Sequence, residues 1–132
     1  MSSDPISDMF SQLRNGWMAK RKNVVIPHSK LKFEFLKKLE EKKLIKKIEI
    51  ENRPGGNGQK KIIVELSYLE NKQAPIETIK IISKPSRRWY AGWRELRSGW
   101  AGSVIVSTSR GLLFDNEARR QKLGGEVIVE II

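Results

Sequence analysis

Apolar and polar residues alternate with two different periods along the first part of the chain. An apolar residue recurs every three or four positions between residues 6 and 17, which predicts an amphipathic helix. Asp4 and Pro5 are typical of a helix start, and Asn15-Gly16 is expected to end this helix. The β-branched run at residues 24–26, closed by a proline, predicts a short strand.

A second helix and a hairpin are predicted next. Ser29 is placed to cap a helix whose apolar stripe runs over residues 31–39. Two segments of strand alternation, around Ile48 and Val64, then flank the turn-forming stretch at residues 53–59. Residues 1–68 are therefore expected to form a lobe of order α-β-α-β-β, with two helices layered on a small sheet.

The remainder of the chain is dominated by strand patterns, at residues 76–83, 104–106 and 126–132. A short helical turn is expected near residues 93–96. Asp115 is expected to cap a short helix that Gly124-Gly125 ends. The polar stretch 69–75 is predicted as a linker, so the second lobe covers residues 76–132. The predicted fold class is α+β, with a second lobe that is mostly antiparallel β with one short helix.

The composition excludes several classes of function. The chain of 132 residues has no cysteine and a single histidine, His28, which excludes disulfides, thiolate metal sites and clusters of several histidines. The usual proton shuttle at neutral pH is thus nearly absent, so we expect neither an enzyme nor a cofactor. No apolar run approaches the roughly 20 residues of a membrane-spanning helix, and no secretory signal is visible. A cytoplasmic protein without membrane contact is expected.

The charge points to a polyanionic partner. Lysine and arginine total 26 against 15 acidic residues, which gives a net charge of +11. Residues 1–75 hold 16 basic and 9 acidic side chains, and residues 76–132 hold 10 and 6, so both halves are basic. An excess of this size on a small domain favours nucleic acid as the partner.

Two segments of the second half carry candidate contacts to RNA. Residues 84–97 interleave five basic residues with Trp89, Tyr90 and Trp93, and such rings either stack on unpaired bases or pack in the core. Residues 107–111 are rich in hydroxyls that suit an RNA minor groove. On chemistry alone, however, a turn whose hydroxyls bond its own backbone is favoured there. A further basic cluster, at residues 20–22 with Lys30, Lys32, Lys37 and Lys38, is either a solvated face or a set of phosphate contacts.

The chain resembles the bacterial form of the small-subunit ribosomal protein eight family. The N-terminal match comprises Asp4-Pro5-Ile6 with Asp8-Met9, Arg14-Asn15-Gly16, and Pro27-His28-Ser29-Lys30-Leu31-Lys32. The C-terminal match comprises Ser83-Lys84-Pro85, Arg88 with Tyr90, Val106-Ser107-Thr108-Ser109-Arg110-Gly111, and Glu117-Ala118-Arg119 through Leu123-Gly124-Gly125-Glu126. The chain departs from the family pattern at Ser86, where glycine is usual, and at Trp89, Trp93 and Trp100.

The resemblance implies a structural constituent of the small ribosomal subunit. Such a protein binds 16S ribosomal RNA directly, grips an irregular helix of the central domain, and aids assembly beside neighbouring small-subunit proteins. The contacts it implies in the C-terminal lobe are Ser107, Thr108, Ser109, Gly111, Tyr90 and Arg88, with Glu126 in support. The N-terminal set it implies is Arg14, Asn15, Ser29, Lys30 and Lys32. Alternatives are a translational repressor that binds its own messenger RNA, and a double-stranded RNA binder outside the ribosome.

Overall fold

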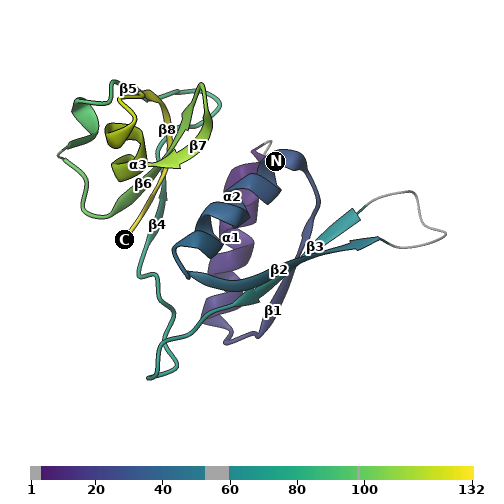
Figure 1. Ribbon diagram of the computed structural model, residues 1–132. Helices are drawn as coiled ribbons and strands as arrows, with labels where there is room; N and C mark the ends of the chain where they lie inside the picture. The colour runs from purple at the N-terminus through teal and green to yellow at the C-terminus, as the bar shows by residue number, and fades with distance from the viewer. Residues whose placement is uncertain (1–3, 53–59, 98) are drawn as a thin grey trace. The chain divides into compact units, whose positions relative to one another are not determined.

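The computed structural model describes residues 4–52, 60–97 and 99–132 (Figure 1). The chain divides into two compact units, Met1–Pro75 and Ile76–Ile132. Both units combine helices with antiparallel sheets, which confirms the predicted α+β class. Among the described residues, no helix is both long enough and apolar enough to span a membrane.

The N-terminal unit has the predicted order of elements. These are α1 (Pro5–Met18), β1 (Asn23–Pro27), α2 (Lys30–Glu41), β2 (Ile45–Asn52) and β3 (Lys60–Leu66). The strands form an antiparallel sheet in the order β1-β3-β2, and both helices lie over one face of it (Figure 1). Phe10 of α1 meets Phe35 of α2 edge to face, with 5.8 Å between the ring centroids. The two apolar stripes therefore form one core with the sheet.

The expected end of the first helix is wrong, because α1 continues through Asn15-Gly16 to Met18. A Cβ atom on Gly16 would lie 2.5 Å from Cγ2 of Val24, so glycine here permits close packing of the helix on β1. The helix ends at Met18, and the chain turns away at Lys20, which takes the left-handed conformation with φ of 58°. A glycine can therefore mark close packing as readily as a helix end.

The predicted hairpin joins β2 and β3. Asn52 pairs with Lys60, and the register continues to Ile48 opposite Val64. The turn expected at residues 53–59 lies outside the described residues. Ile62 and Val64 of β3 are fully buried, which agrees with the alternation in that segment.

The C-terminal unit has more strands than the sequence predicted. Its elements are β4 (Ile79–Ile81), β5 (Tyr90–Ala91), a short 3-10 helix η1 (Glu95–Arg97), β6 (Ser103–Thr108), β7 (Gly111–Phe114), α3 (Asp115–Arg120) and β8 (Gly125–Ile131). The sheet has the order β4-β8-β6-β7, and β5 also pairs with β8. The strand predicted at residues 76–83 is reduced to the three residues of β4, whereas β5 and β7 were not predicted. The strands around residues 104–106 and 126–132 are confirmed.

The expected role of Asp115 as a helix cap is wrong. Phe114 precedes α3, and Asp115 is its first residue. The Asp115 carboxylate instead accepts the backbone N–H of Val104 at 3.3 Å, which ties the helix to β6. Lys122 takes the left-handed conformation after the helix, with φ of 56°, and the following glycines lead into β8 rather than ending α3.

Candidate nucleic-acid interface

Three segments that are distant in sequence meet in one row of the C-terminal sheet. Tyr90 of β5 pairs with Glu126 of β8, and Glu126 pairs with Ser107 of β6. Residues directly opposite one another on neighbouring antiparallel strands project from the same face. We refer to Tyr90, Glu126 and Ser107 as the sheet row.

The neighbouring positions show that this row projects from the face opposite the apolar cluster around Val106. Val106 pairs with Val127, one position along from the sheet row, and both are fully buried in a cluster with Leu96, Val104, Leu113 and Ala118. Because side chains alternate along a strand, Ser107 and Glu126 project from the opposite face. The burial of Val106 and Val127 in this cluster thus fixes the face from which the sheet row projects.

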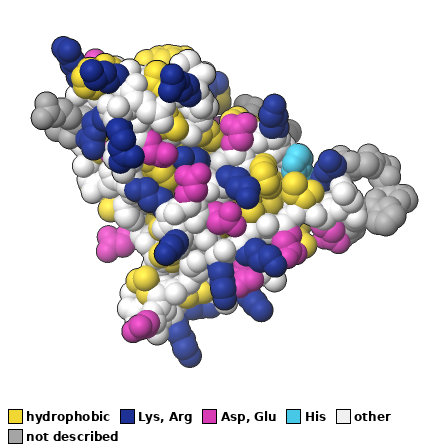
Figure 2. Space-filling view, in the orientation of Figure 1, with side chains coloured by type: hydrophobic (Ala, Val, Ile, Leu, Met, Phe, Trp, Pro, Cys, Tyr) yellow, Lys and Arg dark blue, Asp and Glu magenta, His cyan; other side chains and the backbone are white. Residues whose placement is uncertain are grey.

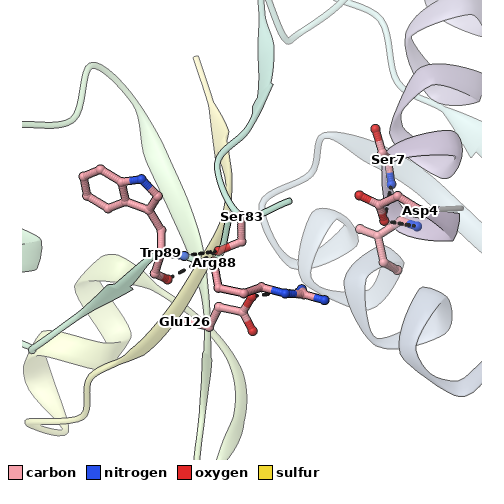
Figure 3. Close-up of polar contacts among 7 residues, drawn as sticks. Asp4, Ser7, Ser83, Arg88, Trp89 and Glu126 are labelled. Atoms are coloured by element: carbon pink, nitrogen blue, oxygen red, sulfur yellow. Dashed lines mark hydrogen bonds and ion pairs between the residues drawn. The ribbon is translucent and has the colours of Figure 1, made fainter. Parts of the chain in front are cut away.

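An ion pair extends the sheet row. Nη1 of Arg88 lies 3.1 Å from Oε2 of Glu126, and Figure 3 shows the two side chains pointing toward one another. The Arg88 side chain is about half exposed. A surface pair of this kind contributes little to stability. Its effect is to hold a guanidinium beside the sheet row with further N–H donors available for phosphate oxygens.

The backbone before Tyr90 is held by a buried serine. Ser83 is 4% exposed, and its hydroxyl accepts the N–H of Trp89 at 2.9 Å (Figure 3). Lys84 and Arg87 exchange backbone hydrogen bonds of 3.0 and 2.9 Å around a tight turn. Ser86, in that turn, is not among the positive-φ residues of the described chain, so the turn does not require the usual glycine.

The structure distinguishes among the three aromatic residues of this segment. Tyr90 is 68% exposed, so its ring is open to a partner and does not pack in the core. Trp89 packs edge to face against Trp100, with 6.3 Å between centroids, and remains 45% exposed. Trp93 is half-buried under the Arg94 guanidinium, which lies 5.0 Å from the ring centroid. Tyr90 is the most accessible stacking surface of the three.

The hydroxyl-rich segment forms a tight hairpin between β6 and β7. Thr108 pairs with Gly111, which leaves Ser109 and Arg110 at the turn. The Thr108 hydroxyl donates to the Gly111 carbonyl at 2.8 Å and accepts the Arg110 N–H at 3.1 Å, so this hydroxyl stabilises the turn itself. Ser109 is exposed at the tip, and the backbone of Gly111 is open, since nothing lies within 4 Å of where its Cβ would be.

The N-terminal candidates fall into two separate groups. Arg14 and Asn15 are exposed on α1, and Asn15 lines a groove of about 510 Å³ beside residues 23–25 at the start of β1. Ser29, Lys30 and Lys32 follow the other end of that strand. The structure therefore does not bring these two groups into one site.

One member of the second group has a clear structural task. The Ser29 hydroxyl accepts the N–H of Lys32 at 3.1 Å as the N-cap of α2, as the sequence predicted. Lys30 is exposed, whereas Lys32 is half-buried. In the part of the chain that the structure describes, no three His, Cys, Asp or Glu side chains are grouped to hold a metal ion.

Comparison with known proteins gives a consistent result over nearly the whole chain. The family model described as Ribosomal protein S8 matches residues 4–132. The chain is 43% identical to the small ribosomal subunit protein uS8 of Sphingopyxis alaskensis, over 98% of this chain and 97% of the relative. It is 38% identical to the protein of the same name from Rubrobacter xylanophilus, over 96% and 95%. The chain therefore belongs to the ribosomal protein S8 family, whose members are structural, non-enzymatic components of the small ribosomal subunit.

Proposed function

We propose that this protein binds 16S ribosomal RNA directly and so helps to organise the central domain of the small subunit during assembly. Membership of the family places the protein on the cytoplasmic ribosome as a structural component. The specific contact is assigned to the sheet row, to Arg88, and to the turn that carries Ser109 and Gly111.

The observation that carries this proposal is the convergence of the sheet row. An exposed aromatic ring, a carboxylate paired with an arginine, and small hydroxyl groups lie together on neighbouring strands. Stacking on a ring suits an unpaired base, and small polar groups can approach a base edge or a 2′-hydroxyl closely. An irregular RNA helix offers both features, because its unpaired bases interrupt a regular minor groove.

Thr108 and Glu126 have supporting tasks in this arrangement. Thr108 stabilises the turn through the hydrogen bonds of its hydroxyl. Its contact with RNA would therefore be made by its main-chain atoms. The Glu126 carboxylate fixes the Arg88 guanidinium, and a carboxylate itself accepts hydrogen bonds from base amino groups or 2′-hydroxyls. Both residues thus position donors that approach the RNA.

Sequence-independent attraction comes from both units. Figure 2 shows lysine and arginine side chains spread over much of the displayed face rather than gathered in one patch. We assign contacts with the RNA phosphate backbone to four residues of the N-terminal unit. These are Arg14, Asn15 and Lys30, which are exposed, and Lys32 at the start of α2. Neighbouring small-subunit proteins are the other expected partners.

A titration against salt tests the proposal. If about five phosphates are neutralised, log affinity for a 16S central-domain fragment falls against log salt with a slope of roughly −3 to −4.5. Binding should also be much tighter than to an arbitrary duplex of equal length. A flat salt response, or equal affinity for both RNAs, would contradict the proposal.

A further inference from the structure

The N-terminal unit has a second concavity, which is not lined by any residue of the candidate interface. It has a volume of about 600 Å³ and is lined by Lys20, Lys22, Lys46, Glu65, Leu66, Ser67 and Tyr68. We call it the lysine hollow. Its lysines come from the segment between α1 and β1 and from β2, and three ammonium groups against one carboxylate leave an excess of positive charge.

The walls of the lysine hollow are joined by hydrogen bonds between distant segments. Trp17 Nε1 donates to the Ser67 carbonyl at 3.0 Å, and the Tyr68 hydroxyl donates to the Arg21 carbonyl. The Leu66 N–H donates to the Lys22 carbonyl at 2.9 Å. A tyrosine hydroxyl is a donor at neutral pH, and burial raises the pKa of Tyr68 further above it. The segment that carries Lys20 and Lys22 is thereby held against the end of β3.

Two of the lysines are positioned by neighbouring structure. Lys20 lies in the left-handed conformation, with φ of 58°, and its Nζ donates to the Lys72 carbonyl at 2.8 Å. Lys46 lies where the register of β2 and β3 shifts between Ile45 and Lys47, and such a bulge redirects a side chain. A cation held in place loses less conformational entropy when it binds an anion.

The acidic member of the hollow does not neutralise it. Glu65 Oε2 lies 3.4 Å from Nζ of Lys46, whose side chain is 72% exposed. A pair this exposed is weak in water, so an incoming phosphate competes for the ammonium at little cost. Lys20 bonds a neutral carbonyl and keeps its charge.

We propose that the lysine hollow binds a phosphate of the RNA backbone, separately from the contacts of the C-terminal unit. This inference rests on the proposed function, since it names a further contact with the same RNA. Three lysines that line one concavity suit the electrostatic, sequence-independent contact that lysine provides to phosphate. An acidic segment of a protein would satisfy the same charges, but an RNA with one charge at every nucleotide matches the net charge of +11 better.

The test uses the full chain with Lys22→Gln and Lys46→Gln combined, which leaves the Lys20 hydrogen bond in place. The matched control combines Lys43→Gln and Lys60→Gln, two exposed lysines of the same unit that lie outside the hollow and outside the basic cluster. Both variants lose two charges. With the 16S central-domain fragment, we expect the salt slope of the hollow variant to become less steep by about one to two, while the control changes by less than half of that.

A third variant should change RNA affinity and the salt slope in the opposite direction. Glu65→Gln removes the carboxylate that lines the hollow among the described residues, and it should tighten RNA binding several-fold and steepen the salt slope. Equal slopes for the hollow variant and its control, or no gain for Glu65→Gln, would overturn the phosphate site. If RNA binding is unchanged but incorporation into small subunits falls, the hollow contacts a protein and the assignment to RNA is wrong. Loss of selective binding by the unmodified chain would instead refute the proposed function itself.

Discussion

The two units arrange their candidate contact residues in different ways. In the N-terminal unit, the Ser29 hydroxyl caps α2, and the candidate residues are divided between opposite ends of β1. In the C-terminal unit, strand pairing places Tyr90, Glu126 and Ser107 in one row, with the Tyr90 ring exposed. The Ser29 hydroxyl is therefore engaged by its own helix, whereas Ser109 is exposed at its turn. From this difference we expect selective recognition mainly in the C-terminal unit, with general charge attraction coming from both units.

The largest effect is expected from a change that disrupts the sheet row itself. A Cβ atom on Gly125 would lie 2.0 Å from the Ser107 carbonyl oxygen, so Gly125→Ala must separate β8 from β6. We expect a loss of about 3 kcal/mol in the free energy of unfolding, together with loss of selective RNA binding. Denaturant unfolding measures the first effect.

Gly111→Ala is the control for that experiment. Its Cβ would meet nothing within 4 Å, and only the left-handed φ of 96° opposes it, so a smaller cost of about 1–2 kcal/mol is expected. Equal destabilisation by the two substitutions would show that the close approach at Gly125 is unimportant.

Tyr90→Ala separates recognition from stability. The ring is 68% exposed, so its removal should leave the melting temperature nearly unchanged. Affinity for the 16S fragment should fall by about 1–3 kcal/mol, the typical value of one stacked base. The salt slope should stay constant because no charge changes. A lower melting temperature with intact affinity in the folded protein would return Tyr90 to a structural role.

Two serine variants test the comparison of the units directly. Ser109→Ala should weaken selective binding by about 1–3 kcal/mol with little change in stability, because Ser109 is exposed at the turn. Ser29→Ala removes the N-cap of α2 and should lower the free energy of unfolding by about 1 kcal/mol. Its effect on RNA affinity should be small. RNA affinity and the free energy of unfolding should be measured on both variants. Weaker binding by Ser29→Ala together with lower stability of Ser109→Ala would show that Ser29 contacts RNA and Ser109 stabilises the fold.

The smallest effect concerns pH. Burial raises the pKa of Tyr68 above its ordinary 10.0, so the folded state holds this proton more tightly than the unfolded state does. The resulting stability is complete below pH 10 and is lost as the pH rises through the folded pKa. Unfolding experiments between pH 9 and 11 should show this decrease in the native chain and less of it in Tyr68→Phe. Identical pH dependence in the two proteins would contradict it.

Several candidate site residues could be singled out before their arrangement was known. Tyr90 and residues 107–111 stood out as aromatic and hydroxyl-rich positions among basic residues. The sequence left two interpretations of residues 107–111 open, contact with an RNA minor groove or a turn whose hydroxyls bond its own backbone. The hydrogen bonds of Thr108 support the second interpretation for that residue. By contrast, nothing in the sequence marked Lys46 as a candidate contact, because a lysine in an alternating strand normally lies on the solvent-facing side of that strand. Only the bulge in β2 brings it to the lysine hollow.

Local periodicity predicted much of this protein from its sequence: two amphipathic helices, the β2–β3 hairpin, and the buried strands β6 and β8. The charge added the expectation of a polyanionic partner. These features depend on residues within a few positions of one another or on their simple sum. Tertiary structure decided what depends on contacts between distant residues. The two-residue strand β5 exists because β8 lies beside it, Gly16 lies inside α1 because Val24 packs against it, and Asp115 bonds Val104 instead of capping its helix. Hydrogen bonding and close packing across long sequence separations leave no periodic trace, so only the folded chain shows them.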